Sequence, residues 1–467
     1  MERRDFIKAG ATAAAVVASK PLFGWQGANN RVRMAVIGCG NRAARVFDSL
    51  ARHSETQWVA GCEVNDQKLN SFMTPARQTF KLEMATDYRR ILDRKDVDAV
   101  LIGTPDFSHA RIMADAVAAG KDVYVEKPAS NTVPRLNAML EAFNKTNRIV
   151  QVGTQQRSWD HFIEAKKLLD SGVLGNITQV IISQPGSYAR PREDAQPVPA
   201  GLDWKMWQLL GMNLGAPERD FKPSRLGFRA WYEYGSGLIG DWGAHHVDVA
   251  NWFMNADHKV PLRTAAVGSF ITTPDADPEM VPDTFSISWL YDTHTMTFAN
   301  GVMARPKDTD IEGWGVFFIS GRGSLQVNRM GYALRPAVPT TQRKQGAPPP
   351  PTAGNVNLGA APAAPAGGRG GRGGPGAPGG PGFGGRGANL PPLEEKLYIN
   401  PRGGVEEDYP LDAHTRNFLD CLKSRNKPNA TMEIGYNSAL PCLLALESLK
   451  TGKMLGWDAA KREATVL

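Results

Sequence analysis

Residues 33–43 read RMAVIGCGNRA, and this stretch decides the fold of the N-terminal part of the chain. Its first half is short, apolar and ends in a glycine, as a buried parallel strand does. Its second half, Gly38 to Ala43, has the spacing GxGxxA and opens a helix. The glycines allow a tight turn and a close approach of the backbone to a pyrophosphate, which the helix N-terminus stabilises. The stretch predicts a dinucleotide-binding turn formed by Gly38, Gly40, Asn41 and Arg42.

Strand-like and helix-like segments alternate after this turn. Residues 57–62, 97–102 and 122–125 are short apolar runs, and residues 42–53 and 109–119 are typical of helices. Alternation of this kind is characteristic of a doubly wound parallel sheet. We therefore expect an α/β protein that begins with a Rossmann domain over residues 31–151.

The pattern changes after Val152. Strand-like segments at 179–183, 284–289 and 295–298 follow one another with turns between them. This predicts a C-terminal α+β domain over residues 152–467, built on a largely antiparallel open sheet. Residues 341–392 are dominated by Pro, Gly and Ala, and we expect them to form a disordered, solvated insert in that domain.

Residues 1–30 have the features of a targeting segment. Arg3, Arg4 and Lys8 precede a weakly apolar stretch at 9–18 that is too short to span a bilayer. The opening resembles a twin-arginine export signal and predicts a periplasmic or otherwise exported protein. No strong cleavage site follows, so retention of the signal as a membrane anchor stays open.

Charge and cysteine content exclude several classes of site. The formal net charge is +7, but the excess lies in residues 1–30 and 341–392, which leaves the predicted folded body neutral and gives no reason to expect a nucleic-acid partner. The four cysteines are scattered and contain no Cys-x-x-Cys pair. Neither a disulfide framework nor a zinc site is indicated.

An acidic residue follows the second strand-like segment. Glu63 lies 25 residues after Gly38. A carboxylate at this place accepts hydrogen bonds from a ribose 2′-OH and repels a 2′-phosphate, which favours NAD over NADP. Asp66 is a second choice for the same contact.

Polar residues also follow two further strand-like segments. Thr104 and His109 come after one of them, and Glu126 and Lys127 after the next. Ligands of open parallel sheets gather at these carboxyl ends, so we expect all four residues at the cofactor. A lysine there can hydrogen-bond a substrate hydroxyl or the nicotinamide amide. A packed helix start for His109 and a surface ion pair for Lys127 are the structural alternatives.

Residues 240–252 read GDWGAHHVDVANW. In a helix, Asp241, His245 and Asp248 lie on one face. A histidine beside a carboxylate suits proton abstraction from an alcohol. A helix cap at Asp241 and a packed core histidine are the structural alternatives. A metal site that includes His246 is disfavoured because adjacent histidines point apart.

Four motifs thus follow one another along the chain: the Gly38 turn, the segment with Thr104 and His109, the segment with Glu126 and Lys127, and residues 240–252. This ordered set resembles the Gfo/Idh/MocA family of glucose–fructose oxidoreductase and inositol dehydrogenase. The resemblance is carried by Gly38–Ala43, by the sequence AGKDVYVEKP at 119–128, and by Asp241 with His245. Gly153–Arg157 and Gly240–Gly243 are similar to an exported bacterial branch of this family. The insert at 341–392 has no counterpart in it.

The resemblance implies an NAD-dependent oxidoreductase that acts on a sugar or polyol by hydride transfer. It implies that Lys127 contacts the reacting hydroxyl and the nicotinamide, and that His245 is the general acid/base beside Asp241. It makes Gln156 and Arg157 candidates for the substrate pocket, and it implies a homo-oligomer that pairs through the open sheet.

Export restricts how such an enzyme works, because the periplasm has no replenished NAD pool. We therefore expect NAD to be held tightly and regenerated in each cycle. One alternative is an NAD-assisted glycosidase, in which transient oxidation acidifies a neighbouring C–H, a leaving group is eliminated, and the hydride is returned. A second alternative is a sugar- and NAD-binding protein without turnover.

Overall fold

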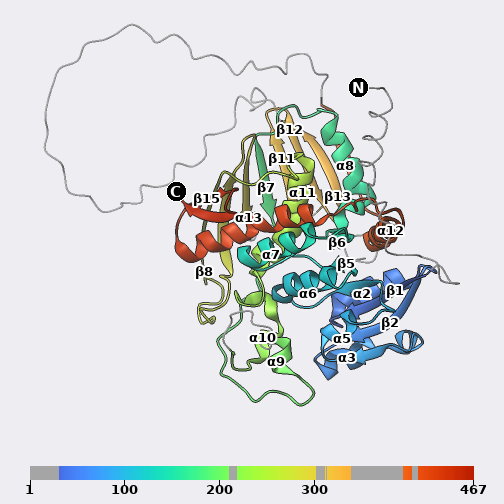
Figure 1. The fold of residues 1–467 in the computed structure, drawn as a ribbon. Coiled ribbons are helices and arrows are strands. Elements are labelled where there is room, and N and C mark those ends of the chain that lie inside the picture. Colours follow the sequence, from blue (N-terminus) through green and yellow to red (C-terminus); the bar gives the residue numbers. More distant parts are fainter. Residues whose placement is uncertain (1–30, 210–217, 301–310, 312, 338–392, 402–408) are drawn as a thin grey trace, which may run out of the picture.

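The computed structural model describes residues 31–209, 218–300, 311, 313–337, 393–401 and 409–467 (Figure 1). The export signal predicted at 1–30 and the insert predicted at 341–392 lie outside the described residues. Two sheets, one for each predicted domain, organise the described part of the chain.

The first sheet is parallel throughout and has the strand order β3-β2-β1-β4-β5-β6. Every residue of its inner strands β4 and β5 is buried, in agreement with the apolar sequence of β4 and with Val123, Tyr124 and Val125 of β5. The doubly wound sheet predicted from the sequence is confirmed. Its strands are β1 (Val32–Ile37), β2 (Thr56–Cys62), β3 (Glu83–Ala85), β4 (Ala99–Ile102), β5 (Asp122–Val125) and β6 (Val150–Val152).

Helices cover both faces of this sheet. Side chains of β1 alternate between the two faces, with Met34 and Val36 in one hydrophobic cluster and Ala35 and Ile37 in the other. The connecting helices are α2 (Asn41–Ala51), α3 (Asp66–Phe72), α4 (Pro75–Gln78), α5 (Tyr88–Leu92), α6 (Asp106–Ala118) and α7 (Val133–Asn144).

The second sheet has ten strands in the order β14-β13-β12-β11-β7-β10-β9-β8-β15-β16. Only the pair β7–β10 is parallel among its described strands. The largely antiparallel sheet predicted for the C-terminal domain is confirmed. Its strands are β7 (Gln179–Ser183), β8 (Arg263–Ser269), β9 (Thr284–Leu290), β10 (Thr295–Ala299), β11 (Gly315–Ser320), β12 (Gly323–Asn328), β13 (Gly331–Pro336), β14 (Lys396–Ile399), β15 (Leu455–Asp458) and β16 (Glu463–Val466).

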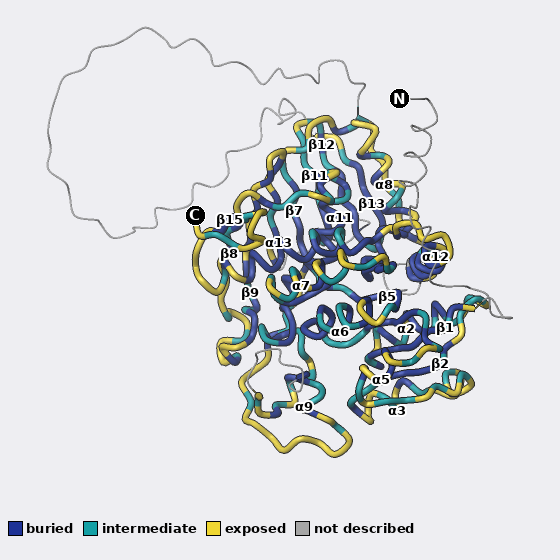
Figure 2. The backbone as a smooth tube through the Cα atoms, viewed as in Figure 1, coloured by how far each residue is buried: buried dark blue, intermediate teal, exposed yellow. Residues whose placement is uncertain are grey.

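Two long helices pack on one face of this sheet, α11 (Gly237–Phe253) and α13 (Met432–Thr451). Phe285, Ile287 and Trp289 of β9 point into the core, whereas the residues between them face outward. Figure 2 shows buried residues through the inner strands of both sheets and through α11, and exposed residues in the loop beside α9. The shorter elements are η1 (Gln155–Ser158), α8 (Asp160–Asp170), α9 (Trp204–Trp207), α10 (Pro223–Leu226) and η3 (Phe228–Ala230).

Helix α12 (Tyr409–Ser424) belongs to the first sheet although it lies far along the chain. Leu411, Phe418 and Leu422 join the cluster formed by β1 and α2. Ser49 of α2 donates a hydrogen bond to Asp412 at 2.6 Å. The domain boundary predicted between residues 151 and 152 placed α12 in the second domain. An apolar stripe predicts a helix but does not specify which sheet the stripe covers.

None of the helices within the described ranges is long and apolar enough to cross a bilayer.

Candidate active site

A cavity of about 610 Å³ lies between the two domains. Most residues predicted for the cofactor and for catalysis line it, although they come from five separate stretches of the sequence. The predicted residues that line the cavity are Gly38, Gly40, Asn41, Arg42, Glu63, Thr104, His109, Glu126, Lys127, Asp241 and His245.

The turn between β1 and α2 is shaped for a phosphate group. Gly38 has φ +84°, and a Cβ there would lie 2.7 Å from the Thr104 side chain. Gly40 precedes α2 and provides no side chain to cap its first turn. A Cβ at Gly103 would lie 2.6 Å from that of Ala43, so the helix approaches the sheet as closely as the fingerprint requires. The turn therefore fits the pyrophosphate of a dinucleotide.

Glu63 follows β2 and is held by the backbone. Its carboxylate accepts hydrogen bonds from the N–H groups of Cys39 (2.7 Å), Val64 (2.8 Å) and Asn65 (3.0 Å). Burial raises the pKa of Glu63 above its ordinary value, and the three N–H donors oppose that rise. The fixed carboxylate fits the hydroxyls of a ribose. Asp66, the second choice, does not line the cavity.

Arg42 and Glu126, which both line the cavity, form an ion pair. Arg42 Nε donates to Glu126 Oε1 at 2.9 Å. A Cβ at Gly153 would lie 2.8 Å from the Glu126 carboxyl group, so the carboxyl is also confined by the chain behind it. The pair ties α2 to the end of β5 and fixes one wall of the cavity.

His109 connects two turns of the first domain. Its Nδ1 lies 2.8 Å from the backbone oxygen of Pro128, and its Nε2 lies 2.8 Å from that of Thr104. The side chain is buried, and burial lowers its pKa. Although His109 lines the cavity, both of its ring nitrogens contact the protein. His109 thereby links the turn that carries Lys127 to the turn that carries Thr104.

Lys127 reaches across the domain boundary to α11. Its Nζ donates to Oδ1 of Asp241 at 2.7 Å and to the backbone oxygen of the same residue at 2.9 Å. Tyr188 donates to the other carboxylate oxygen, and Arg229 Nε lies 3.1 Å from Oδ1. Burial alone would raise the pKa of Asp241, but Lys127 and Arg229 outweigh burial and hold it below its usual range.

His245 lies one turn of α11 beyond Asp241 but does not pair with it. Its Nε2 lies 3.3 Å from an Arg329 nitrogen, and its buried Nδ1 has no hydrogen-bond partner among the residues described. Burial lowers the pKa of His245, and Lys127 and Arg329 lower it further. The expectation that Asp241 orients His245 is wrong in this structure, because the carboxylate turns toward Lys127 and Arg229.

The two residues predicted for the substrate pocket do not line the cavity. Arg157 lies against Asp248, with Nε 2.9 Å from the carboxylate, and also contacts Asp257. Gln156 is buried beside it. The neighbouring Gln155 lines the cavity instead, and its Oε1 has no partner within the described ranges. A buried carboxylate needs a counter-ion, which explains the direction of Arg157.

The neighbouring His246, for which the sequence disfavoured a metal-binding role, contacts Gln184 and Trp242. Its Nε2 lies 3.0 Å from Gln184 Oε1, and its ring stacks on Trp242. The described part of the chain contains no group of three or more His, Cys, Asp or Glu side chains placed to hold a metal ion.

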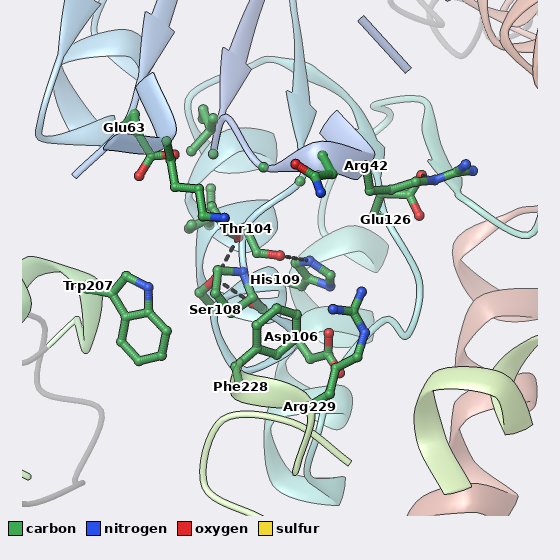
Figure 3. A pocket seen from close by; sticks show the side chains of 18 of the residues that line it. Arg42, Glu63, Thr104, Asp106, Ser108, His109, Glu126, Trp207, Phe228 and Arg229 are labelled. Carbon is green, nitrogen blue, oxygen red and sulfur yellow. Dashed lines mark hydrogen bonds and ion pairs between the residues drawn. The ribbon is translucent and has the colours of Figure 1, made fainter. Parts of the chain in front are cut away.

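Several cavity residues were not predicted from the sequence. Asp106, the first residue of α6, is buried, and burial raises its pKa to about 7. Figure 3 shows it beside Arg229 and Phe228. Asp106 lies between Thr104 and His109, in the segment that follows β4, so the rule that ligands gather at strand ends could have found it. Further cavity residues that the sequence did not single out include Tyr188, Met206, Phe228, Arg229 and Arg329.

Known proteins with related sequences cover both domains. The Gfo/Idh/MocA family matches twice, as "Oxidoreductase family, NAD-binding Rossmann fold" over residues 32–154 and as "Oxidoreductase family, C-terminal alpha/beta domain" over residues 161–316.

Among curated relatives, oxidoreductase P35 of Formosa agariphila is 30% identical over 149 residues, which are 32% of this chain and 46% of P35. Inositol 2-dehydrogenase of Salmonella typhimurium is 26% identical over 252 residues, which are 54% of this chain and 62% of that enzyme. The chain thus spans less than two thirds of the length of either relative.

Among solved structures, the aldose–aldose oxidoreductase of Caulobacter crescentus, complexed with glycerol, superposes with a TM-score of 0.54. It is 18% identical, and the match covers 91% of this chain and 99% of that one. At this identity the likeness concerns the fold. The two family matches, the order of the strands and the cavity between the two domains lead to one conclusion: this chain belongs to the Gfo/Idh/MocA oxidoreductase family, with an NAD-binding Rossmann domain followed by the family's C-terminal alpha/beta domain.

Proposed function

We propose that this chain oxidises a hydroxyl group of a sugar or polyol by hydride transfer to NAD. One observation carries the proposal. The Lys127–Asp241 pair and His245 line the same cavity as the Gly38 turn and the Glu63 carboxylate. The substrate class is supported by distant relatives that act on inositol and on aldoses. NAD, when bound, supplies the acceptor for the hydride.

The protein's own residues would handle the hydroxyl proton. Lys127 donates hydrogen bonds from a cationic amine that Asp241 holds in place, and such a donor stabilises negative charge that develops on a hydroxyl oxygen. His245 has a lowered pKa and is neutral near pH 7. A neutral imidazole can accept the hydroxyl proton. We assign Lys127 to the hydroxyl oxygen and His245 to the proton.

Asp106 supports the NAD-assisted glycosidase as a second candidate. Elimination requires a further group that removes a C–H proton or protonates the leaving group. Asp106 lines the same cavity, and its pKa of about 7 allows it to exchange a proton near neutrality. A sugar- and NAD-binding protein without turnover is the third candidate.

The deciding experiment combines absorbance at 340 nm with mass analysis of the denatured supernatant, before and after addition of candidate sugars and aryl glycosides. NAD that becomes NADH with a sugar supports the dehydrogenase. Aryl glycoside cleavage without net NADH supports the glycosidase. Bound NAD with neither reaction supports the binding protein. A chain that binds no nicotinamide cofactor contradicts all three.

We also propose that the chain is exported and forms a homo-oligomer. The sequence of residues 1–30 supports export through the twin-arginine route. Exposed apolar side chains on the outer side of the second sheet, such as Val267 on β8, support pairing between copies. Export in turn favours NAD that is held tightly and regenerated within the cavity.

A further inference from the structure

A segment of the second domain crosses to the first domain beside the cavity. We call residues 199–209 the strap. Asp203 N–H donates to the backbone oxygen of Val64 at 2.9 Å, and Asp66 N–H donates to that of Gly201 at 2.8 Å. Asn65 and Leu202 form an antiparallel bridge between these two hydrogen bonds. The strap is therefore paired with the first domain through its backbone.

The place of this pairing matters for the cofactor. Val64 and Asn65 donate the N–H groups that hold the Glu63 carboxylate, and both residues line the cavity. The strap therefore pairs with the residues that directly follow Glu63, two of which hold the carboxylate proposed to contact the ribose. It covers the side of the cavity where the adenosine half of a dinucleotide would lie.

The contact between strap and first domain is closely fitted. Gly201 has φ +77°, and a Cβ there would lie 2.7 Å from Asp66 Oδ2. A side chain at this position would strain the backbone and displace the Asp66 carboxyl group. Glycine is thus needed for the strap to approach this closely.

Beyond the bridge, the strap forms part of the cavity wall. Asp203 caps α9 by accepting a hydrogen bond from Met206 N–H at 2.9 Å. Met206, Trp207 and Leu209 line the cavity (Figure 3 shows Trp207). The Trp207 ring packs against Phe107 of α6, with ring centroids 5.4 Å apart. The strap thus contacts the first domain at the residues after Glu63 and again at Phe107 of α6.

We propose that the strap retains the dinucleotide. The cofactor leaves only after the Asp203–Val64 and Asp66–Gly201 hydrogen bonds have opened, so it dissociates slowly and is reused in place. The inference rests on the proposed function to the extent that the cavity holds NAD. It adds that residues 199–209, to which no part in proton or hydride transfer is assigned, set the rate of cofactor release.

Release of NADH tests the strap directly. The full chain is loaded with NADH, an excess of NAD is added, and the loss of bound-NADH fluorescence is followed in wild type and in Gly201→Ala. Two backbone hydrogen bonds together correspond to a factor of about thirty, so we expect release from the variant to be up to about thirtyfold faster. Trp207→Ala, which removes a wall contact without changing the backbone, should also accelerate release.

Gly172→Ala is the matched control. Gly172 also has a positive φ (+73°), but a Cβ there meets nothing within 4 Å, and the residue lies outside the cavity. Its release rate should equal that of wild type. If Gly201→Ala and Trp207→Ala both release NADH at the wild-type rate, the proposal that the strap retains the dinucleotide is wrong.

The two proposals fail in different ways in this experiment. A wild-type chain that binds NADH and releases it as fast as Gly201→Ala refutes the strap alone, and reduction of NAD by a sugar then still decides the proposed function. Bound NAD that resists exchange, without conversion of any sugar or glycoside, supports the strap and contradicts the proposed enzyme. A chain that binds no nicotinamide cofactor refutes both.

Discussion

Lys127 and Asp241 belong to different domains and are joined by two hydrogen bonds, from Lys127 Nζ to the carboxylate (2.7 Å) and to the backbone oxygen (2.9 Å) of Asp241. The amine proposed to contact the substrate is thus held by the first turns of α11. Its position depends on how the two domains meet, and the geometry of the site is set by the interface as well as by either sheet.

We expect Lys127→Ala to lower kcat by about 10²- to 10⁴-fold, the range found when a group that transfers or stabilises a proton is removed. Asp241→Asn should lower kcat less, because the amide can still accept a hydrogen bond from the amine. The exposed Lys167 of α8 provides the control, and Lys167→Ala should behave as wild type in steady-state assays. Full activity of Lys127→Ala would contradict the assignment.

Removal of the carboxylate at Glu63 should change the cofactor preference. A hydrogen bond to a charged group contributes about 1.5–3 kcal/mol, so we expect Glu63→Ala to bind NADH about ten- to a hundredfold more weakly. Loss of negative charge should narrow the gap between NADH and NADPH. Fluorescence titration with both cofactors measures this change, with the exposed Glu83→Gln as control. An unchanged ratio of the two affinities would show that Glu63 does not select the cofactor.

Asp106 should make stability depend on pH. Its pKa in the folded chain is about 7, above that of an unfolded aspartate near 3.9. Between these values the folded chain holds a proton that the unfolded chain has lost, so its contribution to stability is complete below about pH 4 and is lost as pH rises through 7.

Asp106→Asn should remove this dependence. We expect the variant to have a higher Tm than wild type at pH 8 and a similar Tm at pH 4, as measured by thermal unfolding monitored by circular dichroism. If the variant and wild type had the same Tm at pH 8 as well as at pH 4, the Asp106 carboxyl group would be charged at neutrality in the folded protein. A loss of glycoside cleavage in this variant, with NAD reduction by sugars retained, would support the eliminative chemistry.

Arg157 should act on stability and not on substrate binding. Arg157→Met leaves Asp248 buried without its partner, and breaking such a pair costs about 3–5 kcal/mol. We expect a clear drop in Tm, with KM for the sugar unchanged in the folded fraction. The double variant Arg157→Met/Asp248→Asn should recover part of the loss. A raised KM of Arg157→Met without a change in Tm would show that Arg157 contacts the substrate.

The sequence predicted the fold because local patterns encode it. The turn at Gly38 and the alternation that follows it determine a doubly wound sheet, and the rule that ligands gather at strand ends placed Glu63 and Lys127 at the cavity. Tyr188, Arg229 and Arg329 come from segments without periodicity, so no pattern predicted them.

The spacing of residues along the sequence also did not determine which side chain pairs with Asp241. Asp241 and His245 share a face of α11 as predicted, but spacing gives no information on which charges reach the carboxylate. Two cations from elsewhere in the chain, Lys127 and Arg229, compete for it more strongly than a neutral imidazole does. The same limitation applies to Arg157, whose partner Asp248 lies 91 residues away.

The position of α12 has a consequence for synthesis of the chain. Leu411, Phe418 and Leu422 complete the hydrophobic cluster around β1 and α2, yet the ribosome makes them after nearly all of the second sheet. Domains usually fold in order of synthesis, N-terminal first. Here the nucleotide domain cannot finish burying one face of its sheet until residue 422 has been made. A nascent or truncated chain that ends at residue 160 would expose this apolar face and be prone to aggregate, so the cofactor-binding unit is finished only when translation is almost over.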